Sequence, residues 1–170
     1  MTAYRIVYLG DPVLRTSGDP VTGFDAALAR LIADMFETMY AAQGVGLAAN
    51  QVGVGLRVFV FDCDEDGGYG QVGHVVNPRL VETRGQTAED PEGCLSLPGL
   101  QFPTPRAEWA AVEGFDQAGQ PVRIEGKGYL ARCLQHETDH LDGKVYTDRL
   151  TGEARRTALR AIREATWSAR

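Results

Sequence analysis

One stretch of the chain, LQHETDHLDG, restricts its fold and chemistry more than any other. It places His136 and His140 four residues apart, so on an α-helix both imidazoles lie on one face and can bind one cation. Glu137 can then take a proton from a metal-bound water, which is how HExxH motifs work. The alternative is a helix whose histidines only pack or face solvent, but the flanking Leu134 and Leu141 indicate a helix against a core. We therefore expect a hydrolytic metal site that still lacks its third protein ligand.

Few residues can supply that third ligand. In thermolysin-like enzymes a downstream glutamate serves, and Glu153 and Glu164 are available. The remaining histidine, His74, lies upstream in a strand-like run and is expected to be structural or exposed. Cys94 lies in a loop rich in glycine and proline, EDPEGCLSLPGL, from which a thiolate could reach the helix. These residues by themselves leave both a glutamate and Cys94 open.

Length and composition exclude several classes of protein. The chain has 170 residues, which suits one core, and we expect residues 1–170 to form a single domain. The net charge of −6 argues against direct nucleic-acid binding. No apolar run approaches the ~20 residues of a membrane span, and the N-terminus lacks a secretory pattern, so no membrane binding is expected. Three widely spaced cysteines favour a reducing compartment over a disulfide framework, and hence a cytoplasmic location.

Hydrophobic periodicity predicts one helix and two strands in the first half of the chain. From Asp25 to Gln43 apolar residues recur at helical spacing, and Asp25 can cap the first turn. Residues 57–63 and 74–82 have the composition of strands, and an acidic, glycine-rich turn at 64–70 separates them.

The second half predicts a loop, a hairpin and two helices. Residues 86–106 contain four prolines and no clear period, so this segment should be rich in loops. Residues 107–127 predict a hairpin around the turn QAGQ. A helix should run from about 128 to 141, and a C-terminal helix should lie on the body from 153 to 168. The predicted fold class is α+β, with short, mostly antiparallel strands around a central HExxH helix and with N- and C-terminal helices.

Three motifs in one order resemble a known family. They are GVGLAANQ (Gly44–Gln51), EGCLS (Glu92–Ser96) and QHETDHLDG (Gln135–Gly143). In this order and at this spacing they resemble bacterial peptide deformylase of the compact type. The resemblance extends from about Asp11 to Leu150 and so covers most of the chain.

The resemblance implies a metal centre and a reaction. One divalent ion would be held by Cys94, His136 and His140, natively Fe²⁺, which Zn²⁺, Ni²⁺ or Co²⁺ can replace. The reaction would remove the formyl group from the formyl-methionine of nascent polypeptides and release formate. Glu137 would transfer the proton, and the side-chain amide of Gln51 and the backbone N–H of Leu95 would stabilise the oxyanion.

Further residues are candidates for substrate binding. The backbone of Val45 and Gly46 could pair with an extended peptide, and Gly93 in the cysteine motif is a further candidate for substrate binding. Three residues share the helix face of His136 and could line a methionine pocket, namely Tyr129, Arg132 through its aliphatic stem, and Cys133. Core packing is the alternative for Tyr129 and Cys133.

The last predicted helix carries four arginines. Arg155, Arg156, Arg160 and Arg163 could contact the ribosome near the exit tunnel, where formylated chains emerge. A solvated helix face is the simpler interpretation of the same residues.

Overall fold

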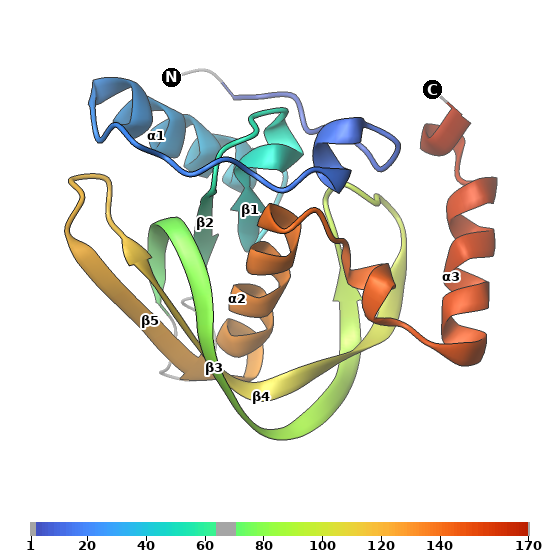
Figure 1. Cartoon of the computed structure of the whole chain (residues 1–170). Helices are drawn as coiled ribbons and strands as arrows, with labels where there is room; N and C mark the ends of the chain where they lie inside the picture. The colour runs from blue at the N-terminus through green and yellow to red at the C-terminus, as the bar shows by residue number, and fades with distance from the viewer. Residues whose placement is uncertain (1–2, 64–70, 170) are drawn as a thin grey trace.

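The computed structural model of the chain describes residues 3–63 and 71–169 (Figure 1). It contains three α-helices, which are α1 (Ala26–Ala41), α2 (Gly128–Leu141) and α3 (Gly152–Glu164). Its five strands are β1 (Gly46–Ala48), β2 (Val58–Asp62), β3 (Val72–Gly93), β4 (Gln101–Phe115) and β5 (Pro121–Lys127). Short 3₁₀ helices, η1 to η4, lie at Pro12–Arg15, Ala49–Val52, Tyr146–Arg149 and Thr166–Ala169. The predicted α+β class is confirmed, whereas the predicted turn at 64–70 lies outside the described residues.

Helix α1 forms where its sequence pattern predicts. The Asp25 carboxylate accepts hydrogen bonds from the backbone N–H groups of Ala27 and Leu28, so it satisfies two donors that the first turn leaves free. The buried face of α1 contains Leu28, Leu31, Ile32, Met35 and Met39, which pack with β1 and β2 in one hydrophobic cluster. This packing places the following GVGLAANQ segment against the centre of the molecule.

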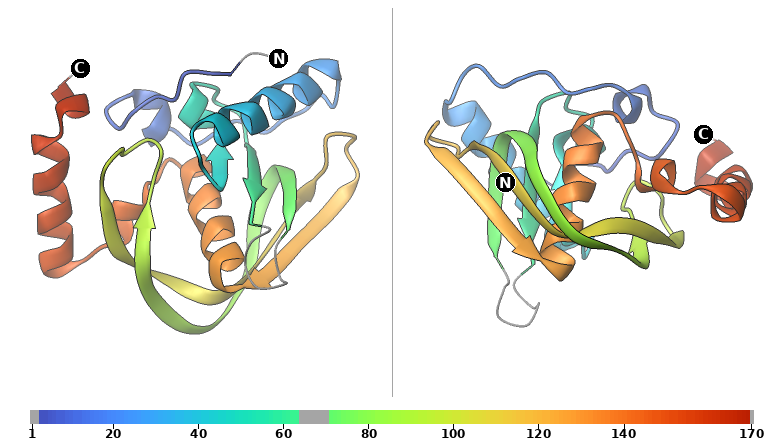
Figure 2. Two further views of the ribbon diagram at one scale, coloured as in Figure 1. Left: turned by 180° about the vertical axis from the view of Figure 1, so that it is seen from behind. Right: turned by 60° about the horizontal axis from the view of Figure 1, so that its bottom comes forward.

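The five strands form one antiparallel sheet in the order β1-β2-β3-β4-β5. Strands β3 and β4 make a long hairpin whose register shifts at three places, and each shift adds bend and twist. The hairpin therefore curves around α2 instead of lying flat (Figures 1 and 2). Its tip, between Gly93 and Gln101, carries the EGCLS motif.

The expectation of a loop-rich segment over 86–106 was wrong. Strand β3 continues to Gly93 and β4 begins at Gln101, so only the tip is a loop. In this part the two strands pair with each other alone, because β2 pairs with 72–76 and β5 with 109–115. Proline is tolerated where an N–H would point to a free edge, and here Pro91 lies directly opposite Pro103. Proline content therefore misled the prediction.

Helix α2 lies inside the curve of the sheet (Figure 2). Every residue from Leu130 to Leu141 is buried, which confirms the predicted central helix. The apolar residues of α2, including Leu130, Leu134 and Leu141, pack with β2 and β3. Burial on all sides fixes the position of this helix and therefore of the side chains it carries.

Helix α3 stands to one side of the molecule (Figure 1). Ala158 is its one buried residue, and Ile162 and Trp167 pack partly against the cluster of Leu97, Val145 and Tyr146. The predicted C-terminal helix is thus present, but it contacts the body through a narrow strip. Within residues 3–63 and 71–169, no helix combines the length and apolarity that crossing a bilayer requires.

Candidate active site

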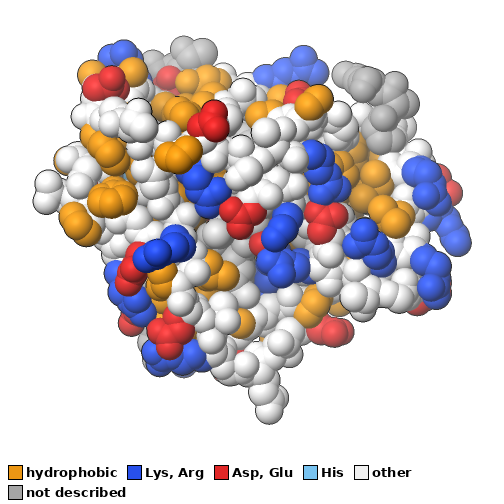
Figure 3. Space-filling model, viewed as in Figure 1, with side chains coloured by type: hydrophobic (Ala, Val, Ile, Leu, Met, Phe, Trp, Pro, Cys, Tyr) orange, Lys and Arg blue, Asp and Glu red, His pale blue; other side chains and the backbone are white. Residues whose placement is uncertain are grey.

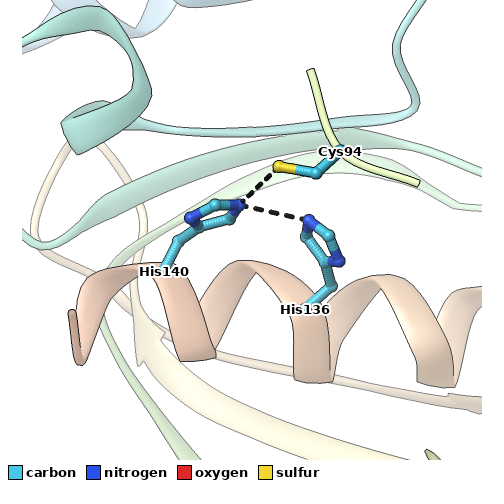
Figure 4. Close-up of side chains that lie close together, drawn as sticks. All are labelled: Cys94, His136 and His140. Atoms are coloured by element: carbon cyan, nitrogen blue, oxygen red, sulfur yellow. Dashed lines mark hydrogen bonds between the residues drawn. The ribbon is translucent and has the colours of Figure 1, made fainter. Parts of the chain in front are cut away.

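The tip of the β3–β4 hairpin brings Cys94 to the two histidines of α2. The Cys94 sulfur lies 3.2 Å from Nε2 of His140, which lies 3.1 Å from Nε2 of His136. In Figure 4 both imidazoles rise from the same face of the helix toward the sulfur. These three atoms all lie within 4.8 Å of one another, which makes the residues a potential metal-binding group.

The donor set fits a catalytic metal ion. A thiolate and two imidazoles suit zinc or ferrous iron, and three protein ligands leave a position open for water or substrate. His140 is fully buried, and burial followed by the nearby His136 lowers its pKa well below the usual value. Its ring therefore stays neutral, which is the form that binds metals. The geometry thus favours an open site over a closed structural one.

Glu137 lies beside this group with a free oxygen. Its side chain is buried, and Oε2 has no hydrogen-bond partner among the described residues. Burial raises the pKa of Glu137 to about 7, although the nearby His136 lowers it. A carboxyl group with such a pKa can both accept and donate a proton near neutrality.

Gly46 gives Glu137 the space it occupies. A Cβ atom at position 46 would lie 2.3 Å from Oε1 of Glu137 and 3.0 Å from the sulfur of Cys133. No side chain fits there unless the carboxylate moves. The glycine of β1 therefore allows the edge strand to pass directly over the carboxylate.

The amide of Gln51 is fixed and points its nitrogen at the site. Its Oε1 accepts a hydrogen bond from the backbone N–H of Ala48 at 2.9 Å. Its Nε2 then faces the hydroxyl of Ser96 at 3.2 Å and the sulfur of Cys94 at 3.5 Å. Because its oxygen is held in this way, the buried amide of Gln51 directs its N–H donors toward Ser96 and Cys94.

A cavity of about 540 Å³ opens beside these groups. Every residue predicted for the site, except the fully buried His140, lines it: Val45, Gly46, Gln51, Gly93, Cys94, Leu95, Tyr129, Arg132, Cys133, His136 and Glu137. Residues from three distant segments of the sequence thus share one cavity. Its volume is sufficient for a few residues of an extended peptide.

Comparison with known proteins decides the family. The family model described as polypeptide deformylase matches residues 3–156, which is most of the chain. The chain belongs to the polypeptide deformylase family. Deformylases are metalloenzymes that act on the formylated N-termini of newly made peptides, so the predicted enzyme class is confirmed.

Individual deformylases resemble the chain over nearly its full length. Peptide deformylase 2 of Streptomyces coelicolor is 58% identical over 94% of this chain and 89% of its own. The peptide deformylase of Acidothermus cellulolyticus is 56% identical over 99% of this chain and 90% of its own. A crystal structure of a peptide deformylase from Legionella pneumophila has 44% identity and a TM-score of 0.86, covering 96% of this chain and 95% of that one.

The thermolysin-like alternative was wrong for this deformylase. Glu153 and Glu164 lie exposed on α3, outside the group formed by Cys94 and the two histidines. Glu153 instead pairs with Arg156 one turn along the same helix. The family comparison agrees, because it names deformylases over the whole region that holds the site.

The sequence did not reveal the charged groups that contact the candidate metal-binding residues of this deformylase. Oε1 of Glu92 lies 2.5 Å from Nδ1 of His136, and Arg106 binds both oxygens of Glu92 at 2.7 and 3.1 Å. Arg106 also contacts Asp139 at 2.5 Å, and Arg149 holds the same carboxylate. Burial raises the pKa of Glu92, but hydrogen bonds from His136 and Arg106 outweigh it and hold the pKa far below the usual range. The acid of the EGCLS motif was the available signal, since ligand histidines commonly pair with a carboxylate.

Proposed function

We propose that this chain removes the N-formyl group of formyl-methionine at the start of new polypeptides with the groups that meet around Cys94. The convergence of Cys94, His136 and His140 beside the free carboxylate oxygen of Glu137 carries this proposal. Hydrolysis joins the formyl carbon to a water oxygen, breaks its bond to nitrogen and yields formate and a free amine. Activating the water, transferring its proton and stabilising the oxyanion each require a chemical group, and the residues at the cavity supply these groups.

Cys94, His136 and His140 would hold one divalent ion. The resemblance to bacterial deformylases favours Fe²⁺ as the native ion, with Zn²⁺, Ni²⁺ or Co²⁺ as replacements, and the donor set suits this range. When bound, the ion polarises the formyl oxygen and activates water. A thiolate beside ferrous iron also makes sensitivity to oxygen expected.

Glu137 moves the proton in this proposal. Its free Oε2 accepts a proton from the attacking water and then passes it to the leaving nitrogen. Gln51 donates from Nε2 to the oxyanion that develops on the formyl oxygen, and the backbone N–H of Leu95 is the second donor. Removal of one such donor typically costs about 10²–10³ in rate.

The cavity walls would bind the peptide. Strand β1 is the edge of the sheet, so the backbone of Val45 and Gly46 can pair with an extended substrate, and Gly93, which also lines the cavity, would contact it. The methionine side chain would enter between Tyr129, the methylene stem of Arg132, and Cys133. These three residues lie one to two helical turns before His136, on the same face of α2.

A formate-release assay tests the function directly. Protein prepared without oxygen is loaded with Fe²⁺, Zn²⁺, Ni²⁺ or Co²⁺, and the bound metal is quantified. Turnover of a formyl-methionyl tripeptide is then compared with that of its acetyl analogue. We expect one ion per chain and turnover of the formyl peptide alone. Metal-loaded protein that releases no formate would contradict the proposal.

We further propose that residues 1–170 form one domain and that the enzyme acts in the cytoplasm. There it would meet its substrate at the ribosome. Figure 3 shows basic side chains at the edge of the molecule where α3 lies. Arg155, Arg156, Arg160 and Arg163 are located on this helix. Replacing Arg155, Arg160 and Arg163 by glutamate should abolish co-sedimentation with ribosomes and leave turnover of a free tripeptide unchanged. Unchanged co-sedimentation would refute the contact.

A further inference from the structure

Arg132 has an unusual position in this site. It lies on α2 one turn before His136 and lines the cavity, yet its charged side chain is buried. A charged group at such a place needs partners, because an unpaired buried charge is strongly unfavourable. The partners of the guanidinium group therefore indicate what Arg132 does besides lining the cavity.

The guanidinium group of Arg132 joins three segments. Its Nη1 donates to Oε2 of Glu92 and to the backbone oxygen of Thr104, each at 2.8 Å. Its Nη2 donates to the backbone oxygen of Ala88 at 3.0 Å. Glu92 and Ala88 belong to β3, and Thr104 belongs to β4. One side chain thus ties the central helix to both strands of the curved hairpin.

Glu92 is the important partner among these. It lies two residues before Cys94, and its other oxygen contacts Nδ1 of His136 at 2.5 Å. A carboxylate at Nδ1 accepts the N–H of the ring and leaves Nε2 to face His140 within the group that also contains Cys94. The orientation of one metal ligand and the approach of another both depend on where Glu92 is held.

The pairing of the buried charges distinguishes Arg132 from Arg106. Arg106 is shared between the carboxylates of Glu92 and Asp139. Each carboxylate then has an arginine of its own, which is Arg149 for Asp139 and Arg132 for Glu92. The contact of Arg132 with Asp90 adds little, because that carboxylate is 70% exposed and 3.4 Å away.

We propose that Arg132 is a positioning residue of the metal centre: it fixes Glu92, which orients His136 and holds the start of the Cys94 loop. The same residue provides part of the slot wall through its methylene groups. The slot and the metal centre are therefore parts of one hydrogen-bonded unit. This inference rests on the proposed function for the identity of the site, but the ligand geometry carries it independently of turnover.

Two substitutions separate the contribution of the Arg132 methylene groups to the slot wall from that of its guanidinium group. Arg132→Met keeps a long apolar side chain and removes the guanidinium group, whereas Arg132→Ala removes both. Metal affinity is measured for Zn²⁺ by competition with a chelator, and kcat and KM are measured with a formyl-methionyl tripeptide. We expect Arg132→Met to weaken Zn²⁺ binding about tenfold, the effect typical of a partner of a ligand histidine, and to change KM less than twofold. Arg132→Ala should weaken Zn²⁺ similarly and also raise KM severalfold.

A control variant and a double-mutant cycle test whether Arg132 acts on the metal ligands through Glu92. Gln135 also ties α2 to β4, because its amide hydrogen-bonds both backbone groups of Ala107, and the hydrogen bonds of its side chain go to Ala107 and Ala131 and not to Glu92. Gln135→Leu should therefore reduce thermal stability without changing Zn²⁺ affinity. In a Glu92→Gln background, Arg132→Met should have little further effect on Zn²⁺ affinity, because the two residues act in series.

Several results would overturn the proposal. Unchanged Zn²⁺ affinity in Arg132→Met would do so, as would an equal loss in Gln135→Leu or full additivity with Glu92→Gln. If Arg132→Met does not fold, Arg132→Lys serves instead. Its single nitrogen cannot occupy the positions of both Nη1 and Nη2, so we expect a partial loss of affinity. Wild-type protein that binds Zn²⁺ but releases no formate would refute the proposed function and leave the affinity comparison for Arg132 valid.

Discussion

The sulfur of Cys94 lies 3.2 Å from Nε2 of His140, although the two residues are 46 positions apart in the sequence. The contact joins the tip of the curved hairpin to the central helix. A sulfur atom in this candidate ligand group distinguishes it from the site of thermolysin-like enzymes, in which a carboxylate completes the set. The contact therefore gives the most direct test of the metal assignment.

Replacing the sulfur ligand should remove the metal. Cys94→Ser should lower both bound metal and formate release by more than about 100-fold, since even outer partners of metal ligands are typically worth 10–100-fold. Metal content by mass spectrometry and the formate assay measure the two effects. Cys63→Ala is the control, because this buried thiol lies outside the ligand group, and it should retain both. Metal and activity retained in Cys94→Ser would show that another residue is the ligand.

Glu137→Gln should separate metal binding from chemistry. The amide has nearly the same shape as the carboxylate but cannot take a proton, so we expect turnover to fall by about 10²–10⁴. The metal should stay bound, because no Glu137 atom belongs to the ligand group. Rates and metal content are measured on the same samples. A parallel loss of metal would mean that Glu137 supports the ligands instead of moving the proton.

The passage of β1 over Glu137 should be sensitive to a single methyl group. Gly46→Ala would place a Cβ 2.3 Å from Oε1, so the carboxylate must move, and we expect up to about 100-fold lower kcat/KM. Gly55→Ala is the matched control, since a Cβ there meets nothing within 4 Å. Bound metal should change in neither variant. Normal activity in Gly46→Ala would show that the carboxylate can be displaced without cost.

Removal of the Tyr146 hydroxyl should not destabilise the protein. The hydroxyl is buried without a hydrogen-bond partner among the described residues, a state that costs roughly 1–3 kcal/mol relative to a satisfied group. Tyr146→Phe should therefore leave the free energy of unfolding unchanged or raise it by about 1 kcal/mol, as measured by urea titration. Tyr40→Phe, which loses a 2.8 Å bond to Asp62, should lower it or leave it unchanged. A clear loss in Tyr146→Phe would reveal a partner for its hydroxyl.

The stability of the protein should depend on pH through His74. Its Nε2 accepts a hydrogen bond from the backbone N–H of Gln117, and burial lowers its pKa below 6.5, against an opposing effect of Asp116. The unfolded chain therefore binds a proton that the folded chain excludes, so this contribution is fully present above about pH 6.5 and is lost as the pH falls toward the folded pKa. His74→Gln should make the fall in unfolding free energy below pH 6.5 shallower. An unchanged slope would contradict this prediction.

Local patterns explain what could be predicted from the sequence. The helix that carries His136, Glu137 and His140 follows from helical spacing, which depends only on neighbouring residues. The N-terminal helix with its Asp25 cap is predictable for the same reason. The three motifs also indicated the family and contain many of the residues that line the cavity.

Long-range contacts explain what could not be predicted. The curved hairpin was missed because its prolines lie where the two strands pair only with each other, and no local rule reveals a free edge. The sequence indicated a role only for the aliphatic stem of Arg132, and only the fold brings Glu92 and two backbone oxygens to its guanidinium group. The sequence by itself determined which residues could bind the metal and move the proton. The tertiary structure decided how they are held, because the partners of a buried charge come from segments that meet only when the hairpin closes over α2.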